Sequence, residues 1–93
     1  MPDDRGMLFL YPGERRVSLW MKHTLIPLDM VFIRADGTVA NVAAHTEPLS
    51  LESVYSRGPV SAVLELNAGA AARPGIERGR RVYVGHAVQN GLR

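Results

Sequence analysis

Apolar residues in this chain fall in short runs, and turn signals separate the runs. Pairs of proline with glycine stand at residues 12–13, 58–59 and 74–75, and an Asp-Gly pair stands at residues 36–37. Proline fixes φ and lacks a backbone N–H donor, while glycine adopts the positive φ that tight turns require. Short segments between such breaks are typical of strands rather than long helices, so the sequence predicts a mainly β fold.

The runs between these breaks predict six strands. Residues 7–11 form a continuous apolar run, whereas residues 17–22 alternate apolar and polar side chains, the period of a half-buried strand. We expect these two strands to pair as a hairpin through Pro12-Gly13. The strands on either side of Asp36-Gly37 should form a second hairpin. The remaining predicted strands are residues 29–33, 38–42, 60–66 and 80–84.

Two further segments complete the expected fold. Asn67 is a suitable N-cap for a short helix over residues 68–73, which Pro74-Gly75 would end. Residues 43–59 show no regular pattern, and a loop of that length in a small domain is often functional. The 93 residues form a single domain, 1–93. The expected fold class is mainly β with one short helix, a small barrel-like or compact sandwich domain.

Composition argues against several classes of function. The chain has no cysteine, which rules out disulfides, thiolate metal sites and a cysteine nucleophile. The net charge is +2, but the arginines are spread along the sequence without interleaved aromatic residues, so we expect no nucleic-acid partner. No apolar run approaches the roughly 18–20 residues of a spanning helix, so we expect no membrane insertion.

The stretch of residues 20–30, WMKHTLIPLDM, holds most of the candidate site residues. Alternation along residues 17–22 places Trp20 and Lys22 on one face, opposite the apolar positions. On an open face, Trp20 could stack against a sugar or an aromatic ligand, and Lys22 could act as a nucleophile or anchor an anion. Alternatively, Trp20 is the largest core residue and Lys22 pairs with a buried carboxylate.

Two carboxylates, Asp29 and Glu65, stand at the start and in the interior of apolar strands, where a charge needs a partner. If they converged in a cleft, they could act as general acid and base together with Lys22. The structural alternative is ion pairing with Lys22, or hydrogen bonds from Thr24 and Asn67. Both interpretations stay open from the residues alone.

The spacing of histidines, serines and glycines argues against other chemistries. His23, His45 and His86 do not stand at the i, i+4 or strand i, i+2 spacings that set two imidazoles on one metal ion. No serine lies in a Gly-x-Ser-x-Gly elbow, and no glycine pattern matches a phosphate-binding loop. We therefore expect no metal and no other cofactor.

Three blocks of the sequence resemble one protein family. The blocks are residues 6–9 (GMLF), 20–30 (WMKHTLIPLDM) and 63–69 (VLELNAG), with Gly75-Ile76 and Gly79 after the last. Together they resemble the uncharacterised domain-of-unknown-function family 192 over nearly the whole chain. The resemblance implies a mainly β, barrel-like fold with a short helix, and it favours an exported or periplasmic protein. It implies no activity, since the family has no established one.

The chain departs from the family pattern at three points. It lacks the segment that the pattern usually has upstream, so a sheet edge that is normally paired would be exposed. His23 stands where the family often has asparagine, and Arg80 stands where an acid often follows the last turn glycine. These departures argue against a role that position 23 and the Gly79 turn would share with other members of the family.

These observations favour a non-enzymatic domain that binds a small ligand or serves as an accessory module, with its site where residues 20–30 meet the long loop. An alternative is a small enzyme that uses Lys22 with Asp29 or Glu65 as an acid–base pair. A further alternative is an interaction domain that pairs through a strand edge. We expect a monomer or a weak homodimer. The candidate binding residues are Trp20, Lys22, His23, Thr24, Asp29, His45, Glu65 and Asn67.

Overall fold

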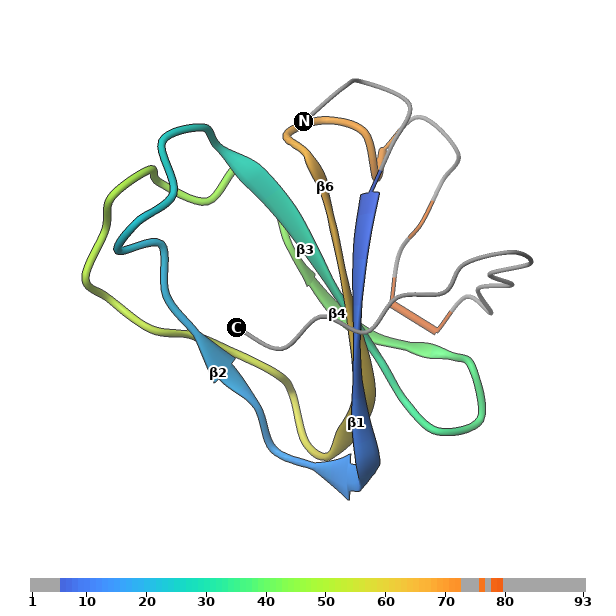
Figure 1. Ribbon diagram of the computed structural model, residues 1–93. Helices are drawn as coiled ribbons and strands as arrows, with labels where there is room; N and C mark the ends of the chain where they lie inside the picture. The colour runs from blue at the N-terminus through green and yellow to red at the C-terminus, as the bar shows by residue number, and fades with distance from the viewer. Residues whose placement is uncertain (1–5, 73–75, 77, 80–93) are drawn as a thin grey trace.

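The computed structural model describes residues 6–72, 76, 78 and 79. These residues form two sheets, and no helix occurs among them. The predicted mainly β class is confirmed. Figure 1 shows four strands side by side and β2 standing apart from them. The strands are β1 (Gly6–Arg15), β2 (Ser18–Leu19), β3 (Leu28–Ile33), β4 (Val39–Ala43), β5 (Val54–Tyr55) and β6 (Val60–Asn67).

The larger sheet has the order β1-β6-β3-β4, and each neighbouring pair is antiparallel. β3 lies in its interior, and all six of its residues are buried. The turn at Asp36-Gly37 joins β3 to β4 as predicted. Arg34 N–H donates to the Thr38 carbonyl at 2.8 Å, and Gly37 adopts a φ of 89°, which glycine allows without steric cost.

Both faces of the larger sheet are covered, and successive residues of β3 point alternately to one face and to the other. Met30 and Phe32 point into one buried cluster, while Val31 and Ile33 point into a second on the opposite face. The smaller sheet, β2-β5, covers the Met30 side, because Leu19 and Val54 pack against that cluster. In the described part of the chain the two sheets do not close into a barrel, so the result is a compact two-sheet β domain.

The predicted hairpin between the first two strands is wrong. β1 pairs with β6, from Gly6 opposite Leu66 to Leu10 opposite Ala62, and β2 pairs with β5. Pro12-Gly13 is an irregularity inside β1, where the register shifts between Leu10 and Arg15. Among the described strands β1 has a partner on one side only, and a proline without an N–H donor is tolerated at such an edge.

The predicted helix over residues 68–73 is not formed in its described part. Residues 68–72 are turns, Gly69 has a φ of 91°, and the backbone N–H groups of Gly69 and Ala71 are bound by the Asp29 carboxylate. A residue with a φ of 91° cannot continue a right-handed helix, and glycine adopts that φ without steric cost, so the backbone turns at Gly69 instead. Residue 73, the predicted strand 80–84 and His86 lie outside the described residues.

Two further predictions concern the long loop and membrane insertion. Residues 44–53 and 56–59 are irregular as predicted, whereas Ala43 belongs to β4 and Val54–Tyr55 forms β5, which sequence reasoning missed. None of the described residues forms a helix that could span a bilayer.

Candidate functional site

The outer face of the β2-β5 sheet carries the tryptophan of the chain. Ser18 lies opposite Tyr55 and Leu19 opposite Val54. Because Leu19 and Val54 point inward to the core, the alternating positions Ser18 and Trp20 point outward. Trp20 is 48% exposed. The predicted alternation is confirmed, and Trp20 is not the largest core residue.

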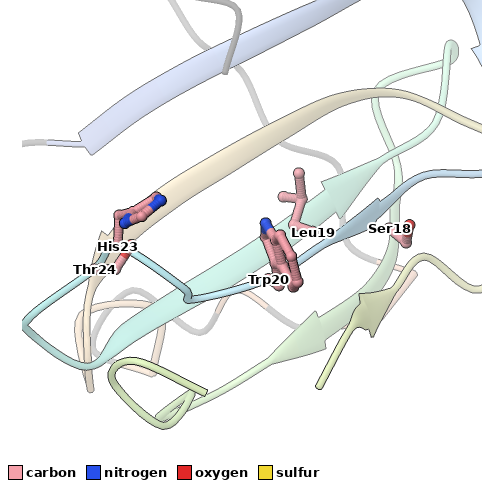
Figure 2. Close-up of a pocket in the computed structure, with 5 residues that line it drawn as sticks. All are labelled: Ser18, Leu19, Trp20, His23 and Thr24. Atoms are coloured by element: carbon pink, nitrogen blue, oxygen red, sulfur yellow. The ribbon is translucent and has the colours of Figure 1, made fainter. Parts of the chain in front are cut away.

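A pocket of about 360 Å³ opens beside Trp20. Figure 2 shows the indole between Ser18 and Leu19 on one side and His23 and Thr24 on the other. Two hydroxyls, an imidazole and an indole N–H thus surround one large aromatic surface. The described lining residues include no carboxylate and no guanidinium group. Such a lining suits a ligand with a flat apolar face and neutral polar substituents.

Lys22 contacts Trp20 rather than a carboxylate. Its Nζ atom lies 5.1 Å from the centroid of the Trp20 ring, within the range of a cation–π contact. Among the described residues, Lys22 forms no ion pair with Asp29 or Glu65, so the predicted pairing is wrong. At an exposed position this contact stabilises by about 0.5–1 kcal/mol, enough to bias how the indole is presented.

Asp29 is buried and binds three backbone N–H groups. One carboxylate oxygen accepts from His45 at 2.9 Å, and the other accepts from Gly69 at 3.0 Å and from Ala71 at 3.1 Å. With 1% of its surface exposed, it has no access to a ligand. The prediction that hydrogen bonds would satisfy this carboxylate is confirmed, but the donors are backbone amides rather than Thr24 or Asn67.

The other predicted residues do not gather at the pocket. Glu65 lies in the middle of the sheet, opposite Met30, with 2% of its surface exposed. Asn67 is half-buried at the end of β6, and His45 is exposed with a φ of 52°. Of the eight candidates, the structure therefore brings Trp20, His23 and Thr24 together at the pocket, with Lys22 stacked on Trp20.

Residues 1–84 match the model of domain-of-unknown-function family 192, DUF192, whose description is "Uncharacterized ACR". The chain belongs to DUF192. The resemblance drawn from the three sequence blocks is thereby confirmed. No curated protein matches the chain.

Two solved structures are similar to this DUF192 chain. One, from Sinorhizobium meliloti 1021, is described as a candidate transcription regulator; it is 47% identical with a TM-score of 0.82. The other is a protein of unknown function from Novosphingobium aromaticivorans DSM 12444, 41% identical with a TM-score of 0.83. Each alignment covers 87% of this chain, and it spans 63% of the first protein and 58% of the second.

Sequence reasoning missed Thr46, which anchors the long loop of this DUF192 domain. Its buried hydroxyl accepts from Leu28 N–H at 3.3 Å and donates to the Leu28 carbonyl at 2.9 Å. Three residues on, Leu49 N–H donates to the carbonyl of Thr24 at 3.0 Å, so the loop is attached directly to a pocket residue. A threonine in an irregular loop gives no pattern that would have identified it.

The described residues of this DUF192 chain include no set of side chains that could hold a metal ion. No group of three or more histidine or acidic side chains converges among them. The two buried carboxylates are also engaged elsewhere: Asp29 binds backbone amides, and Glu65, which is 2% exposed, has an interaction of its own. The chemistry that the site offers is therefore stacking and hydrogen bonding, with the Lys22 ammonium beside the indole.

Proposed function

We propose that this domain is a non-enzymatic module that binds a small ligand in the pocket beside Trp20. The observation that carries the proposal is the exposure of Trp20, a large aromatic residue that is 48% exposed at the wall of a pocket. An indole placed in this way gains stabilisation when the flat face of a sugar or aromatic ring displaces water from it.

The polar groups around the indole support a ligand with a polar rim. The hydroxyls of Ser18 and Thr24 can donate or accept hydrogen bonds, and the His23 ring offers one or two further groups. A few convergent polar groups around an apolar surface are the usual composition of a small-molecule site. The aromatic surface would supply affinity and the polar groups would supply orientation.

Burial of the carboxylates argues against the small-enzyme alternative. That hypothesis needs Asp29 or Glu65 to reach an open pocket together with Lys22. Asp29 is fully occupied by three backbone amides, Glu65 is enclosed in the sheet, and Lys22 is exposed and stacked on Trp20. A general acid or base must reach a substrate proton within hydrogen-bond distance, which two sealed carboxylates do not.

One observation favours strand-edge pairing as a second candidate function. β1 ends the sheet order among the described strands, and its Met7 and Leu10 side chains are exposed. An edge of this kind can pair with a strand of another chain. Self-association in solution that Met7→Lys abolishes would support this candidate, and a chain that stays monomeric at high concentration would remove it.

The relative from Sinorhizobium meliloti is described as a candidate transcription regulator, so DNA is a further partner to consider for this chain. In this chain the arginines are spread along the sequence, and Trp20 has a single lysine beside it. A DNA-binding face usually clusters its basic residues. We therefore retain the small-ligand proposal.

The test is a binding comparison between Trp20→Ala and a matched control. Calorimetric titration with cellobiose, maltose, diacetylchitobiose and phenol covers sugar and aromatic ring faces. We expect Trp20→Ala to lose the binding that the wild type shows, and Trp20→Phe to keep part of it. Since Trp20 is half exposed, its removal should change the free energy of unfolding by less than about 1 kcal/mol.

The control is Leu10→Ala, which removes a comparably exposed apolar side chain from β1, an edge strand of the other sheet. It should leave binding unchanged. If Trp20→Ala binds every probe as tightly as the wild type does, the proposal is wrong. If Trp20→Ala fails to fold, while Trp20→Phe folds but binds no better than a buffer blank, Trp20 has a structural role instead.

A further inference from the structure

We infer that Tyr55 forms a second stacking position beside Trp20, and that the ligand is a neutral oligosaccharide whose successive rings contact the two aromatic side chains. The inference rests on the proposed function, because it uses the same outer face. It adds a residue that lies on a different strand and a class of ligand that is longer than one ring.

The strand register places the two aromatic residues on one face. Tyr55 lies directly opposite Ser18 across the β2-β5 pair, so their side chains point to the same side. Trp20 is two residues after Ser18 and therefore shares that side. The pairing ends at Leu19 and Val54, and Trp20 and Ser53 are the next residues on the two segments, so Tyr55 is diagonal to Trp20 across the pair. In a regular strand pair, diagonal neighbours lie about 7–8 Å apart, which is within reach of aromatic side chains.

The two rings are exposed, while the backbone below Tyr55 is fixed. Tyr55 keeps 67% of its surface in water. Its carbonyl accepts from the Asn41 side chain at 3.1 Å, and the next residue, Ser56, is buried. Ser56 N–H donates to the Val17 carbonyl at 2.8 Å, and Val17 N–H donates to the Ser56 hydroxyl at 2.9 Å. A platform held in this way loses little freedom when a ligand binds.

The chemistry of the face fits a neutral saccharide. The outward positions on the β2-β5 pair and directly beside it are Ser18, Trp20, Ser53 and Tyr55, which are all exposed and uncharged. The ammonium group of Lys22 lies over the Trp20 ring and adds a positive charge to this face. Aromatic rings match the apolar C–H faces of sugar rings, and serine and tyrosine hydroxyls match their equatorial hydroxyl groups. The mixture of rings and hydroxyls, with the Lys22 ammonium as a further donor to hydroxyl oxygens, favours the saccharide.

The experiment measures affinity against the number of sugar rings. The probes are glucose, cellobiose and cellotetraose, with N-acetylglucosamine and its β-1,4-linked dimer and tetramer as a second series. Trp20 is the only tryptophan of the chain, so its fluorescence reports binding at the site, and calorimetry checks the variants. In the wild type we expect affinity in one series to rise about tenfold or more from one ring to four, since each stacked ring adds contact.

Tyr55→Ala should remove the rise in affinity from one sugar ring to four while keeping the affinity for one ring. Tyr55→Phe should preserve the rise. A rise that persists in Tyr55→Ala, or a wild type that binds one ring and four rings equally, overturns the inference and leaves the proposed function standing. Binding of phenol without binding of any saccharide also overturns the inference and leaves the proposed function standing. Trp20→Ala with undiminished saccharide binding overturns the proposed function. Self-association that both Trp20→Ala and Tyr55→Ala abolish, with no saccharide bound, assigns the face to a second copy.

Discussion

At the scale of single residues, Asp29 explains how a small domain holds an irregular loop against its sheet. The carboxylate sits at the start of β3 and binds the backbone of two segments, near His45 and at Gly69 to Ala71. A buried charge is costly unless hydrogen bonds compensate it, and hydrogen bonds to a charged group are stronger than neutral ones. Asp29 therefore acts as a structural connector.

Replacing Asp29 by asparagine should strongly destabilise the domain. An asparagine amide has only one acceptor oxygen, so either the N–H of His45 or the N–H groups of Gly69 and Ala71 would lose their acceptor, and the remaining hydrogen bonds would no longer go to a charged group. Buried donors without an acceptor cost about 1–3 kcal/mol each, so the free energy of unfolding should fall by about 2–5 kcal/mol. Urea unfolding measures the change.

The matched control is Asp36→Asn in the exposed β3–β4 turn, where Asp36 accepts from Thr38 N–H and water can replace the bond. It should cost less than about 1 kcal/mol. Equal losses of stability in the two variants would contradict the role given to Asp29.

The sequence indicated part of this residue-scale picture. Alternation along residues 17–22 correctly placed Trp20 and Lys22 outward, and the apolar context of Asp29 correctly indicated that it needs a partner. The partners themselves are 16, 40 and 42 residues away in sequence and are backbone groups. No side-chain pattern marks a backbone donor, so the sequence could not identify them.

At the scale of elements, the strands were easier to predict than their pairing. The Asp36-Gly37 hairpin was predicted because turn and partner strands are adjacent in sequence. The pairing of β1 with β6 and of β2 with β5 joins segments far apart in sequence, and local patterns carry no information about it. β5 itself has two residues, Val54 and Tyr55, and no period can be detected over that length. Tyr55 was missed as a candidate site residue for this reason.

Thr46 offers an element-scale prediction about the long loop. Thr46→Val keeps the size of the side chain but removes the acceptor of Leu28 N–H in a buried position. The free energy of unfolding should fall by about 1–3 kcal/mol. Amide exchange at Leu49, whose N–H binds the Thr24 carbonyl, should accelerate because the loop loosens beside the pocket.

Ser50→Ala serves as the control, because its hydroxyl accepts from Glu52 N–H at the exposed side of the same loop. Its effect should stay within about 0.5 kcal/mol. Thr46→Val with wild-type stability and unchanged exchange at Leu49 would show that the loop is held by other contacts.

At the scale of the whole molecule, the small sheet carries the core on its inner side and the aromatic side chains of Trp20 and Tyr55 on its outer side, while Leu19 contacts both the core and the pocket. Leu19 and Val54 pack inward, while Ser18, Trp20 and Tyr55 face water. Figure 1 shows β2 standing clear of the larger sheet. Substitutions on the outer face can therefore change binding without disturbing the fold, which makes the functional proposal testable.

The measurement that tests the account most directly is the map of backbone amide chemical-shift changes during titration with cellotetraose and the N-acetylglucosamine tetramer. Nuclear magnetic resonance locates the site without any substitution. The account predicts changes concentrated at residues 18–24 and 53–55, with residues 6–10 of β1 unaffected. Changes centred on β1, or saturable binding that leaves residues 18–24 and 53–55 unshifted, would contradict it.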